Sequence, residues 1–308
     1  MSLIDTTPTT GLDLGSRRFV HPGPLRWLRC LGWVVVLFVV FMLVDAAATI
    51  LPGLWLKGHD ALIALATLAI CAAGYGLYAG VMRLAEDRWP AELALRPALA
   101  ELAIGLLVGA VMMTVVVGLL VGFGLYDVTG PRASSAWGMI SVAIFSGSME
   151  ELVFRAIILR LLMRAFGAWW ALAISAALFG LMHLGNDNAT LTAAFAITIE
   201  AGLMLAAFYM LTGRLWMSVG VHAAWNFAQG WIWGARVSGI EVKESLYLSG
   251  PKAGAPEWLS GGAFGPEASV PAMVVGTGVA IVVLYWAWKK GNFKARDAAP
   301  APVAEVFS

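Results

Sequence analysis

The sequence predicts an all-α integral membrane protein, a polytopic bundle of about eight transmembrane helices with both termini in the cytoplasm. Its composition is 60% hydrophobic and only 13% charged, whereas a soluble domain is usually about half apolar and about a quarter charged. The mean hydropathy of +0.81 agrees with this interpretation. With a net charge of +1 and no basic run, nothing suggests nucleic acid as a partner.

Eight apolar runs are long enough to cross a bilayer, which takes about 20 helical residues. Joints that contain polar residues, glycine or proline separate most of them. The expected spans are residues 31–51, 61–84, 98–125, 136–165, 167–184, 189–212, 215–233 and 270–288. The fourth span is the longest, so we expect it to tilt or to kink at Gly147.

The chain is expected to divide into three parts. These are a cytoplasmic N-terminal segment (1–30), an integral membrane domain (31–290) and a disordered cytoplasmic tail (291–308). The longest polar stretch of the membrane domain, residues 234–269, is predicted to be an extramembrane loop. The first apolar run imitates a signal peptide, but the polar segment before it is too long for one, so we expect a transmembrane helix.

Lysine and arginine determine the expected orientation. Most of the 20 basic residues fall on segments that share one side of the membrane when eight spans are drawn. Examples are Arg26 before the first span, Arg164 at the end of the fourth and Lys289 after the eighth. Because cytoplasmic segments are enriched in lysine and arginine, that side is expected to be the cytoplasm. Arg155 is the basic residue that lies deep inside a span.

Small residues recur four apart in the third span, as Gly105-x-x-x-Gly109 and Gly118-x-x-x-Gly122. Such spacing lets two helices approach closely. We expect packing inside the bundle rather than dimerisation.

Two adjacent carboxylates, Glu150 and Glu151, lie in the fourth span, and Arg155 follows four residues after the second. A charged group deep in a bilayer costs at least ~2.5–3.5 kcal/mol on insertion scales, so it usually has a function or a partner. Residues i and i+4 share a helix face, whereas neighbours diverge by about 100°. Glu151 is therefore expected to pair with Arg155, while Glu150 shares a face with Phe154 and is left for chemistry. A packing network of all three charges fits this motif equally well.

Two further polar patterns lie in other spans. His183 follows Phe179 by four residues in the fifth span, and His222 precedes Asn226 by four in the seventh. Each alone also fits a hydrogen-bonded core residue or a cross-link between helices. At 1.5 Å per residue, these side chains and Glu150 stand about 12–24 Å above the same end of the bundle. We therefore predict one polar site that three helices share.

A carboxylate, two imidazoles and a carboxamide suit hydrolysis. A glutamate removed from water can act as a general base on a water molecule, and an imidazole can help to hold that water. A second histidine and an asparagine amide can donate hydrogen bonds to an oxyanion. Zinc is the weaker alternative, since glutamate and histidine are zinc ligands but the sequence has no H-E-x-x-H motif.

These motifs resemble those of a known family. "EELVFR" matches E-E-x-x-x-R, "FGLMH" matches F-x-x-x-H and "HAAWN" matches H-x-x-x-N. Over about residues 135–235 the chain is similar to the CPBP intramembrane proteases, which include the type II CAAX prenyl endopeptidases and the lysostaphin-resistance-protein-A-like, or Abi, domain. The resemblance implies an endopeptidase that uses a glutamate-activated water to hydrolyse a peptide bond in a membrane-associated substrate, which is prenylated for the CAAX-type members.

The family pattern also implies roles for individual residues. Glu150 would be the base, His183 would assist it, and His222 with Asn226 would form the oxyanion hole. The implied catalytic residues are Glu150, His183, His222 and Asn226, and the implied supporting residues are Glu151, Arg155 and Phe179. No cofactor is expected, with zinc as the alternative. Asp45 and Glu200, also inside spans, belong to no motif, and we expect them to have structural roles.

Two other functions stay open. A family member can act without proteolysis as an immunity or scaffold protein, and intramembrane Glu and His can serve as proton relays in a transporter. The inverted repeats of many transporters are not visible in the sequence. The expected partners are a membrane-embedded or lipid-modified peptide or protein and the lipid bilayer, while the oligomeric state is left open. Short loops and the lack of an organelle signal favour a bacterial inner membrane.

Overall fold

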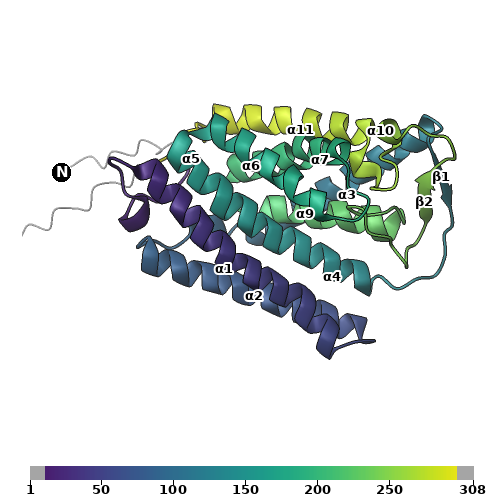
Figure 1. Ribbon diagram of the computed structural model, residues 1–308, viewed down its shortest axis with the longest axis horizontal. Coiled ribbons are helices and arrows are strands. Elements are labelled where there is room, and N and C mark those ends of the chain that lie inside the picture. The colour runs from purple at the N-terminus through teal and green to yellow at the C-terminus, as the bar shows by residue number, and fades with distance from the viewer. Residues whose placement is uncertain (1–10, 297–308) are drawn as a thin grey trace, which may run out of the picture.

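Helical segments run along the molecule (Figure 1). Within residues 11–296 they correspond in order to the eight predicted spans. The computed structural model describes residues 11–296. Among these residues, six helices are long and apolar enough to cross a membrane. They are α1 (Arg26–Trp55), α2 (Asp60–Ala85), α3 (Ala98–Gly122), α6 with the 3₁₀ turn after it (Ala168–Gly185), α7 to α8 (Leu191–Thr212) and α11 (Val270–Lys289).

The fourth and seventh predicted spans are also helical, but π-helical turns interrupt them. The fourth comprises α4 (Trp137–Phe145), the π segments Ser146–Glu150 and Leu152–Leu159, and α5 (Arg160–Phe166). The seventh comprises α9 (Trp216–Phe227) and the π turn Ala228–Ile232. A similar turn, Thr198–Gly202, separates α7 (Leu191–Ile197) from α8 (Leu203–Thr212). Since π turns occur frequently at functional sites, they draw attention to the segments that hold Glu150 and Glu200.

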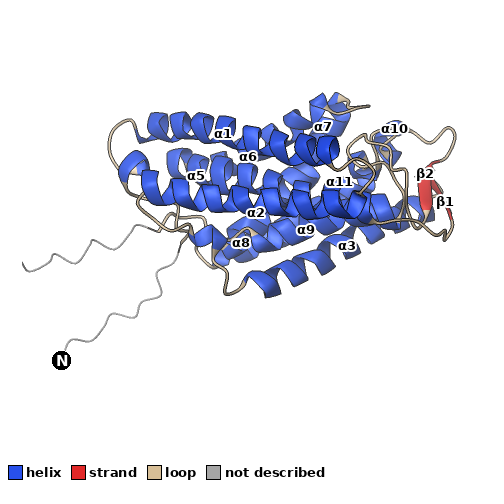
Figure 2. Cartoon of the chain, turned by 90° about the horizontal axis from the view of Figure 1, so that it is seen from below, coloured by secondary structure: helices blue, strands red, loops and turns tan. Residues whose placement is uncertain are grey.

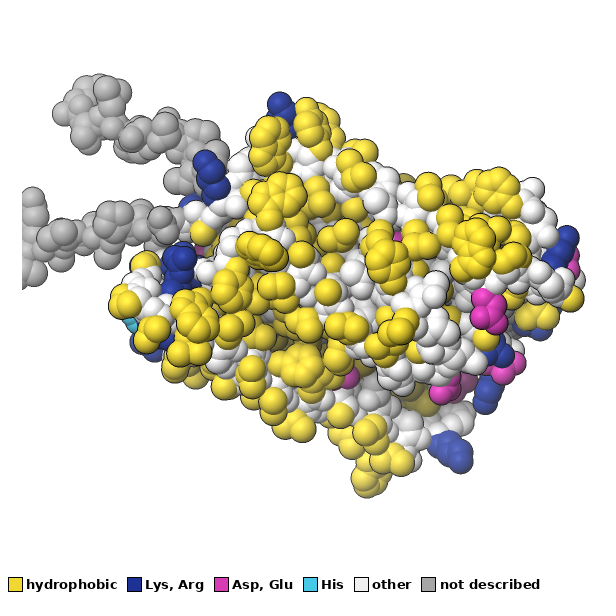
Figure 3. All heavy atoms as spheres, turned by 45° about the horizontal axis from the view of Figure 1, so that its top comes forward, with side chains coloured by type: hydrophobic (Ala, Val, Ile, Leu, Met, Phe, Trp, Pro, Cys, Tyr) yellow, Lys and Arg dark blue, Asp and Glu magenta, His cyan; other side chains and the backbone are white. Residues whose placement is uncertain are grey.

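The outer surface of the bundle is apolar along most of its length. In Figure 3, hydrophobic side chains cover the middle of the molecule, and charged side chains gather toward its two ends. Leu43 of α1 and Leu107 of α3 are examples of large apolar side chains that point outward. Hydrocarbon accepts such a surface, and the helices satisfy their backbone polar groups internally, as a bilayer requires. The chain is thus an integral membrane protein.

The first and last described residues meet at one end of the bundle, called here the terminal end (Figure 1). The Leu12 amide donates to the Lys294 carbonyl at 3.0 Å, and the Arg296 amide donates to the Leu12 carbonyl at 2.7 Å. An even number of crossings brings the two ends of a chain to the same side, as predicted. Residues 1–10 and 297–308, which include most of the predicted tail, lie outside the described residues.

A buried ion network lies at the terminal end. Arg160 Nη2 is 2.8 Å from Glu86 Oε1, and Arg88 Nη2 is 2.7 Å from Glu92 Oε1. The Tyr78 hydroxyl donates to the same Glu92 carboxylate. Burial by itself would raise the pKa of Glu92, but the guanidinium groups of Arg88 and Arg160 outweigh burial and lower it to about 2. These charges therefore stay ionised inside the protein because they neutralise one another.

The opposite end, called here the loop end, contains the two β-strands of the described part of the chain. Strand β1 (Tyr126–Thr129) pairs antiparallel with β2 (Leu248–Pro251), as Figure 2 shows. The predicted loop 234–269 therefore contains a strand, and it also contains the short helix α10 (Glu257–Ser260). Four-residue strands in a polar stretch lack the alternating pattern that would have predicted them.

Helices α3 and α9 approach each other closely at two glycines. A Cβ atom on Gly105 would lie 2.4 Å from the Met217 carbonyl oxygen, and one on Gly109 would lie 2.2 Å from that of Val221. The predicted packing inside the bundle is thus confirmed for this pair. Gly118 and Gly122 instead face open space, since a Cβ atom on either would have no neighbour within 4 Å.

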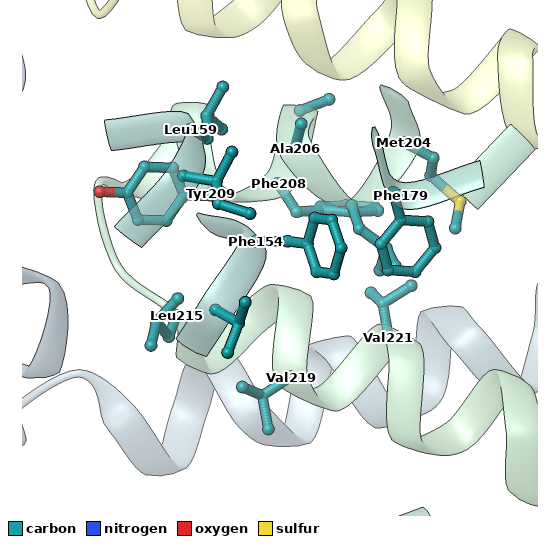
Figure 4. Packing of buried hydrophobic residues seen from close by; sticks show 14 of the residues in the cluster. Phe154, Leu159, Phe179, Met204, Ala206, Phe208, Tyr209, Leu215, Val219 and Val221 are labelled. Carbon is teal, nitrogen blue, oxygen red and sulfur yellow. The ribbon is translucent and has the colours of Figure 1, made fainter. Parts of the chain in front are cut away.

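Aromatic and aliphatic side chains fill the core beside the predicted site. Figure 4 shows Phe154 against Phe179, with Val219 and Val221 of α9 on one side and Met204 of α8 on the other. The rings of Phe154 and Phe179 meet edge to face, with centroids 4.9 Å apart. Close packing of this kind leaves few alternative rotamers, so the core holds the neighbouring polar side chains in place.

Candidate active site

Glu151 connects two of the predicted motifs. Its Oε2 accepts a hydrogen bond from Arg155 Nε at 3.0 Å, which is the expected i to i+4 pair. Its Oε1 lies 2.9 Å from His222 Nδ1 on α9. Glu151 and Arg155 are fully buried. Because a carboxylate accepts the Nδ1 proton, the second ring nitrogen of His222, Nε2, is free to act elsewhere.

Glu150 points in a different direction from Glu151, as the helix geometry predicts. Its side chain is 27% exposed, and its Oε2 is 3.9 Å from His222 Nε2. Together with Phe154 it lines a cavity of about 220 Å³. The two adjacent carboxylates therefore differ in state: Glu151 is held in a buried ion pair, while Glu150 faces open volume.

His183 stands where α6 ends. Its Nδ1 lies 2.7 Å from the Phe179 carbonyl oxygen of the same helix. A carbonyl only accepts, so Nδ1 carries the proton and Nε2 is left as an acceptor. His183 lines the same cavity as Glu150, which places an imidazole acceptor beside the free carboxylate.

Asn226 lies one helical turn after His222, and its side chain is buried. Its Nδ2 donates to Ser146 Oγ at 2.9 Å. Ser146 belongs to the π turn that ends at Glu150, so this bond ties α9 to the segment that carries the free carboxylate. Sequence reasoning missed Ser146, because a lone serine in an apolar helix carries no specific signal.

The ring of Phe179 packs against three side chains of the site. Its ring lies 4.8 Å from that of His183 and 6.0 Å from that of His222, measured between centroids. The guanidinium carbon of Arg155 is 5.0 Å from the same centroid, a cation–π distance. The structure thus brings together all the predicted site residues from the fourth, fifth and seventh spans.

Two larger cavities extend the site toward the loop end. One, of about 370 Å³, is lined by Glu150, His183 and Asn226 and also by Val237 and Ile240. The other, of about 420 Å³, shares Val237 and Ile240 with it and continues to loop residues 241–244. The two cavities share these residues in their walls, so they lie next to each other between the loop end and the polar site.

Asp45 and Glu200, for which we expected structural roles, have no side-chain hydrogen bond within residues 11–296. The Asp45 side chain lines the 220 Å³ cavity with Glu150 and makes no hydrogen bond or ion pair within residues 11–296. Glu200 is fully buried, and both of its carboxyl oxygens lack a hydrogen-bond partner in the same part of the chain. The signal that pointed to them was only their charge within a span.

Glu267, on the loop side, is a further acid that sequence reasoning missed. It is buried in a 3₁₀ turn (Pro266–Ala268) before α11, and it accepts a hydrogen bond from the Ser238 amide. Burial raises the pKa of Glu267, and the nearby His183 opposes this. Glu267 therefore fixes Ser238 beside the site.

For the zinc alternative, no group of three or more His, Cys, Asp or Glu side chains that could hold a metal ion is found within residues 11–296.

A comparison with protein families gives a match over the part of the chain that builds this site. Residues 132–228 match the family model for type II CAAX prenyl endopeptidase Rce1-like proteins. This matched segment, called here the Rce1-like domain, is similar to that family. It covers less than half of the chain and confirms the resemblance to the CPBP and CAAX proteases. No curated protein and no solved structure matches the chain.

The Rce1-like domain contains every predicted site residue. They are Glu150, Glu151, Arg155, Phe179, His183, His222 and Asn226. Asp45 and Glu267 lie outside its bounds, yet they face or adjoin the same site. The helices around the Rce1-like domain therefore contribute to the walls of the site as well as to the membrane bundle.

Proposed function

We propose that the chain is an intramembrane endopeptidase in which Glu150 activates a water molecule without a metal ion. The observation that carries this proposal is the unequal state of the two adjacent carboxylates. Arg155 and His222 each bond to one oxygen of the Glu151 carboxylate, whereas Glu150 faces a cavity beside His183. A carboxylate with room for water at hydrogen-bond distance is what a general base requires.

In the proposed reaction, water binds between Glu150 and His183 Nε2. Glu150 takes one proton as the water oxygen forms a bond to the scissile carbonyl carbon. The C–N bond then breaks, and Glu150 returns the proton to the departing amine. Atoms and charge balance over the cycle, and no covalent enzyme intermediate is required.

The developing oxyanion needs hydrogen-bond donors. His222 Nε2 is one when the ring is protonated, and Glu151 supports that state by accepting from Nδ1. Asn226 Nδ2 is the other, when it exchanges its bond to Ser146 for the oxyanion. With His222 protonated, the charges of Glu150, Glu151, Arg155 and His222 sum to zero, which suits a site of low dielectric.

The substrate is proposed to be a membrane-associated peptide or protein that approaches from the loop end. The adjoining cavities of about 420 and 370 Å³ support this route. Their shared wall is apolar, with Val142, Val237 and Ile240 in it, so it suits an extended, largely apolar segment. The Rce1-like match makes a prenylated segment one candidate class. We also propose a bacterial inner membrane as the location, on the short loops.

The test is cleavage of a panel of membrane-tethered peptides, prenylated and unmodified, by the purified protein in detergent. Glu150→Gln should abolish cleavage, whereas Asp127→Asn, an exposed carboxylate at the loop end, should leave it unchanged. Activity should persist with a chelator present. Equal cleavage by Glu150→Gln and the unaltered protein would remove Glu150 as the base, and chelator-sensitive cleavage restored by zinc would require a metal mechanism.

A further inference from the structure

Glu200 is a buried acid for which the proposed reaction has no use. Its side chain has no exposed surface, and neither carboxyl oxygen has a hydrogen-bond partner within residues 11–296. A buried polar group without a partner is unfavourable by about 1–3 kcal/mol. Retaining such a group in a membrane helix calls for a ligand or a function.

Helix packing holds Glu200 firmly in this position. It lies in the π turn Thr198–Gly202. Helix α11 packs closely against this turn at Gly276, where a Cβ atom would come within 2.8 Å of Glu200 Cα. On the other side, a Cβ atom on Gly202 would come within 2.9 Å of Ala176 in α6. With helices on both sides, the carboxyl group cannot turn outward to the lipid.

Glu200 is one of the residues that line a small cavity beside the proposed active site. Its volume is about 20 Å³, and Glu200 shares it with His183, His222, Asn226 and Ser238. To hold one water molecule, a cavity needs about 10–15 Å³ of space that the centre of the molecule can occupy, and two or more polar neighbours. The cavity meets both conditions.

The protonation state of Glu200 follows from its neighbours. No lysine or arginine lines the cavity. The other titratable groups there are Glu267, His183 and His222, and the ring of His222 is already paired with Glu151. An isolated carboxylate in such surroundings takes up a proton rather than remain charged. A protonated carboxyl group can donate a hydrogen bond, which an ionised one cannot.

Asn226 is the neighbour that needs such a donor. Its Nδ2 donates to Ser146 on the side of the larger cavity. Its Oδ1 accepts no hydrogen bond from the described residues, although Asn226 also lines the small cavity. In the resting site Ser146, whose hydroxyl donates to the Val142 carbonyl, fixes the amide by accepting from Nδ2. When Nδ2 leaves Ser146 for the oxyanion, a donor to Oδ1 is what keeps the amide from turning over.

We propose that Glu200 is a positioning residue that binds one water molecule in the small cavity and, through it, orients the amide of Asn226. Glu200 donates to the water, and the water donates to Asn226 Oδ1. The Nδ2 group is thereby kept available for the oxyanion. This inference rests on the proposed hydrolytic function, because it assigns a role within the same site.

The first test is kinetic and uses three variants of the full chain. Glu200→Leu removes the donor, Glu200→Gln keeps one, and Met204→Leu alters an apolar lining residue of the same cavity. Glu200→Leu should lower kcat roughly 10- to 100-fold with little change in KM, since a misplaced oxyanion donor costs about this much. Glu200→Gln should retain most of the activity, and Met204→Leu should retain all of it. Equal losses in Glu200→Leu and Met204→Leu would reduce Glu200 to a packing residue.

A second test asks whether Glu200 acts through Asn226. In an Asn226→Ala background, adding Glu200→Leu should cause no further loss of kcat, because the group that Glu200 orients is already gone. A full additional loss in the double variant would overturn the proposal.

A third readout does not depend on cleavage, so it separates failure of this inference from failure of the proposed function. Nuclear magnetic resonance of the Asn226 side-chain amide in detergent should show faster hydrogen exchange at Nδ2 in Glu200→Leu than in Met204→Leu. This difference is expected even if no peptide is hydrolysed. Identical exchange in the two variants would show that Glu200 does not hold the amide.

Discussion

Replacing Gly109 with alanine would insert a methyl group into the closest approach of two helices. The new Cβ atom would lie 2.2 Å from the carbonyl oxygen of Val221 and 3.0 Å from the backbone nitrogen of Trp225. Ordinary carbon–oxygen contacts begin near 3.4 Å. Helix α9 must therefore move away from α3 by about 1 Å, because backbone atoms cannot rotate aside as a side chain can.

Two measurable effects should follow. Overpacking of this kind costs about 1–3 kcal/mol of unfolding free energy. The displaced helix also carries His222 and Asn226, which directly follow the contact residues Val221 and Trp225. A displacement of about 1 Å at catalytic groups can lower the rate by about 100-fold, so the loss of activity should exceed what the unfolded fraction explains.

The assay compares Gly109→Ala with Gly118→Ala on the same helix. Gly118 has nothing within 4 Å of its Cβ position, so alanine there should be neutral or stabilising by about 0.5–1 kcal/mol, from helix propensity alone. Thermal unfolding and peptide cleavage would be measured in the same detergent. Equal stability and equal activity in the two variants would refute the packing argument.

Three further predictions concern the buried charges. Arg160→Met should lower the unfolding free energy by about 3–5 kcal/mol, because buried Glu86 keeps only Arg88 of its two guanidinium partners. Denaturant titration measures this loss, and a neutral result would contradict the network's role. Glu92 has a lowered pKa of about 2, so its stabilising effect is present above the ordinary value near 4.5 and is lost as pH falls from there toward 2. The dependence of the melting temperature on pH across that range should flatten in Glu92→Gln, and an unchanged slope would argue against this assignment. Glu151→Gln should lower kcat by about 100-fold across the pH profile, since His222 loses the carboxylate that supports its protonated ring; a change in KM alone would point to substrate binding instead.

The positions of the spans could be read from the sequence because a bilayer imposes a simple rule. Lipid requires about 20 apolar residues for each crossing, and all eight expected runs are helical in the structure. The pairing of Glu151 with Arg155 could also be predicted, since i to i+4 geometry is local. Helix periodicity likewise separated Glu150 from Glu151.

What could not be predicted depends on contacts between distant segments. The hydrogen bond from His222 to Glu151 joins residues 71 positions apart, and no local sequence pattern predicts it. Arg160 lies close to the end of the fourth predicted span, where a basic residue usually meets water, yet it is fully buried against Glu86. The sequence contains both charges, but only the packing of α2 against α5 shows that they neutralise each other. The same holds for Glu200, whose isolation depends on α6 and α11.

The joining of the chain ends at the terminal end has a mechanical consequence. Leu12 is tied to residues 294–296 there, and Arg160 holds the Leu14 carbonyl, so α1 starts from a fixed base. Its 30 residues form a lever about 45 Å long, and Asp45 and Thr49 near its far end line the cavities of the site. A rotation of about 5° at the base would move that far end by about 4 Å. A displacement of this base would therefore be passed along α1 to Asp45 and Thr49, which line the cavities of the site.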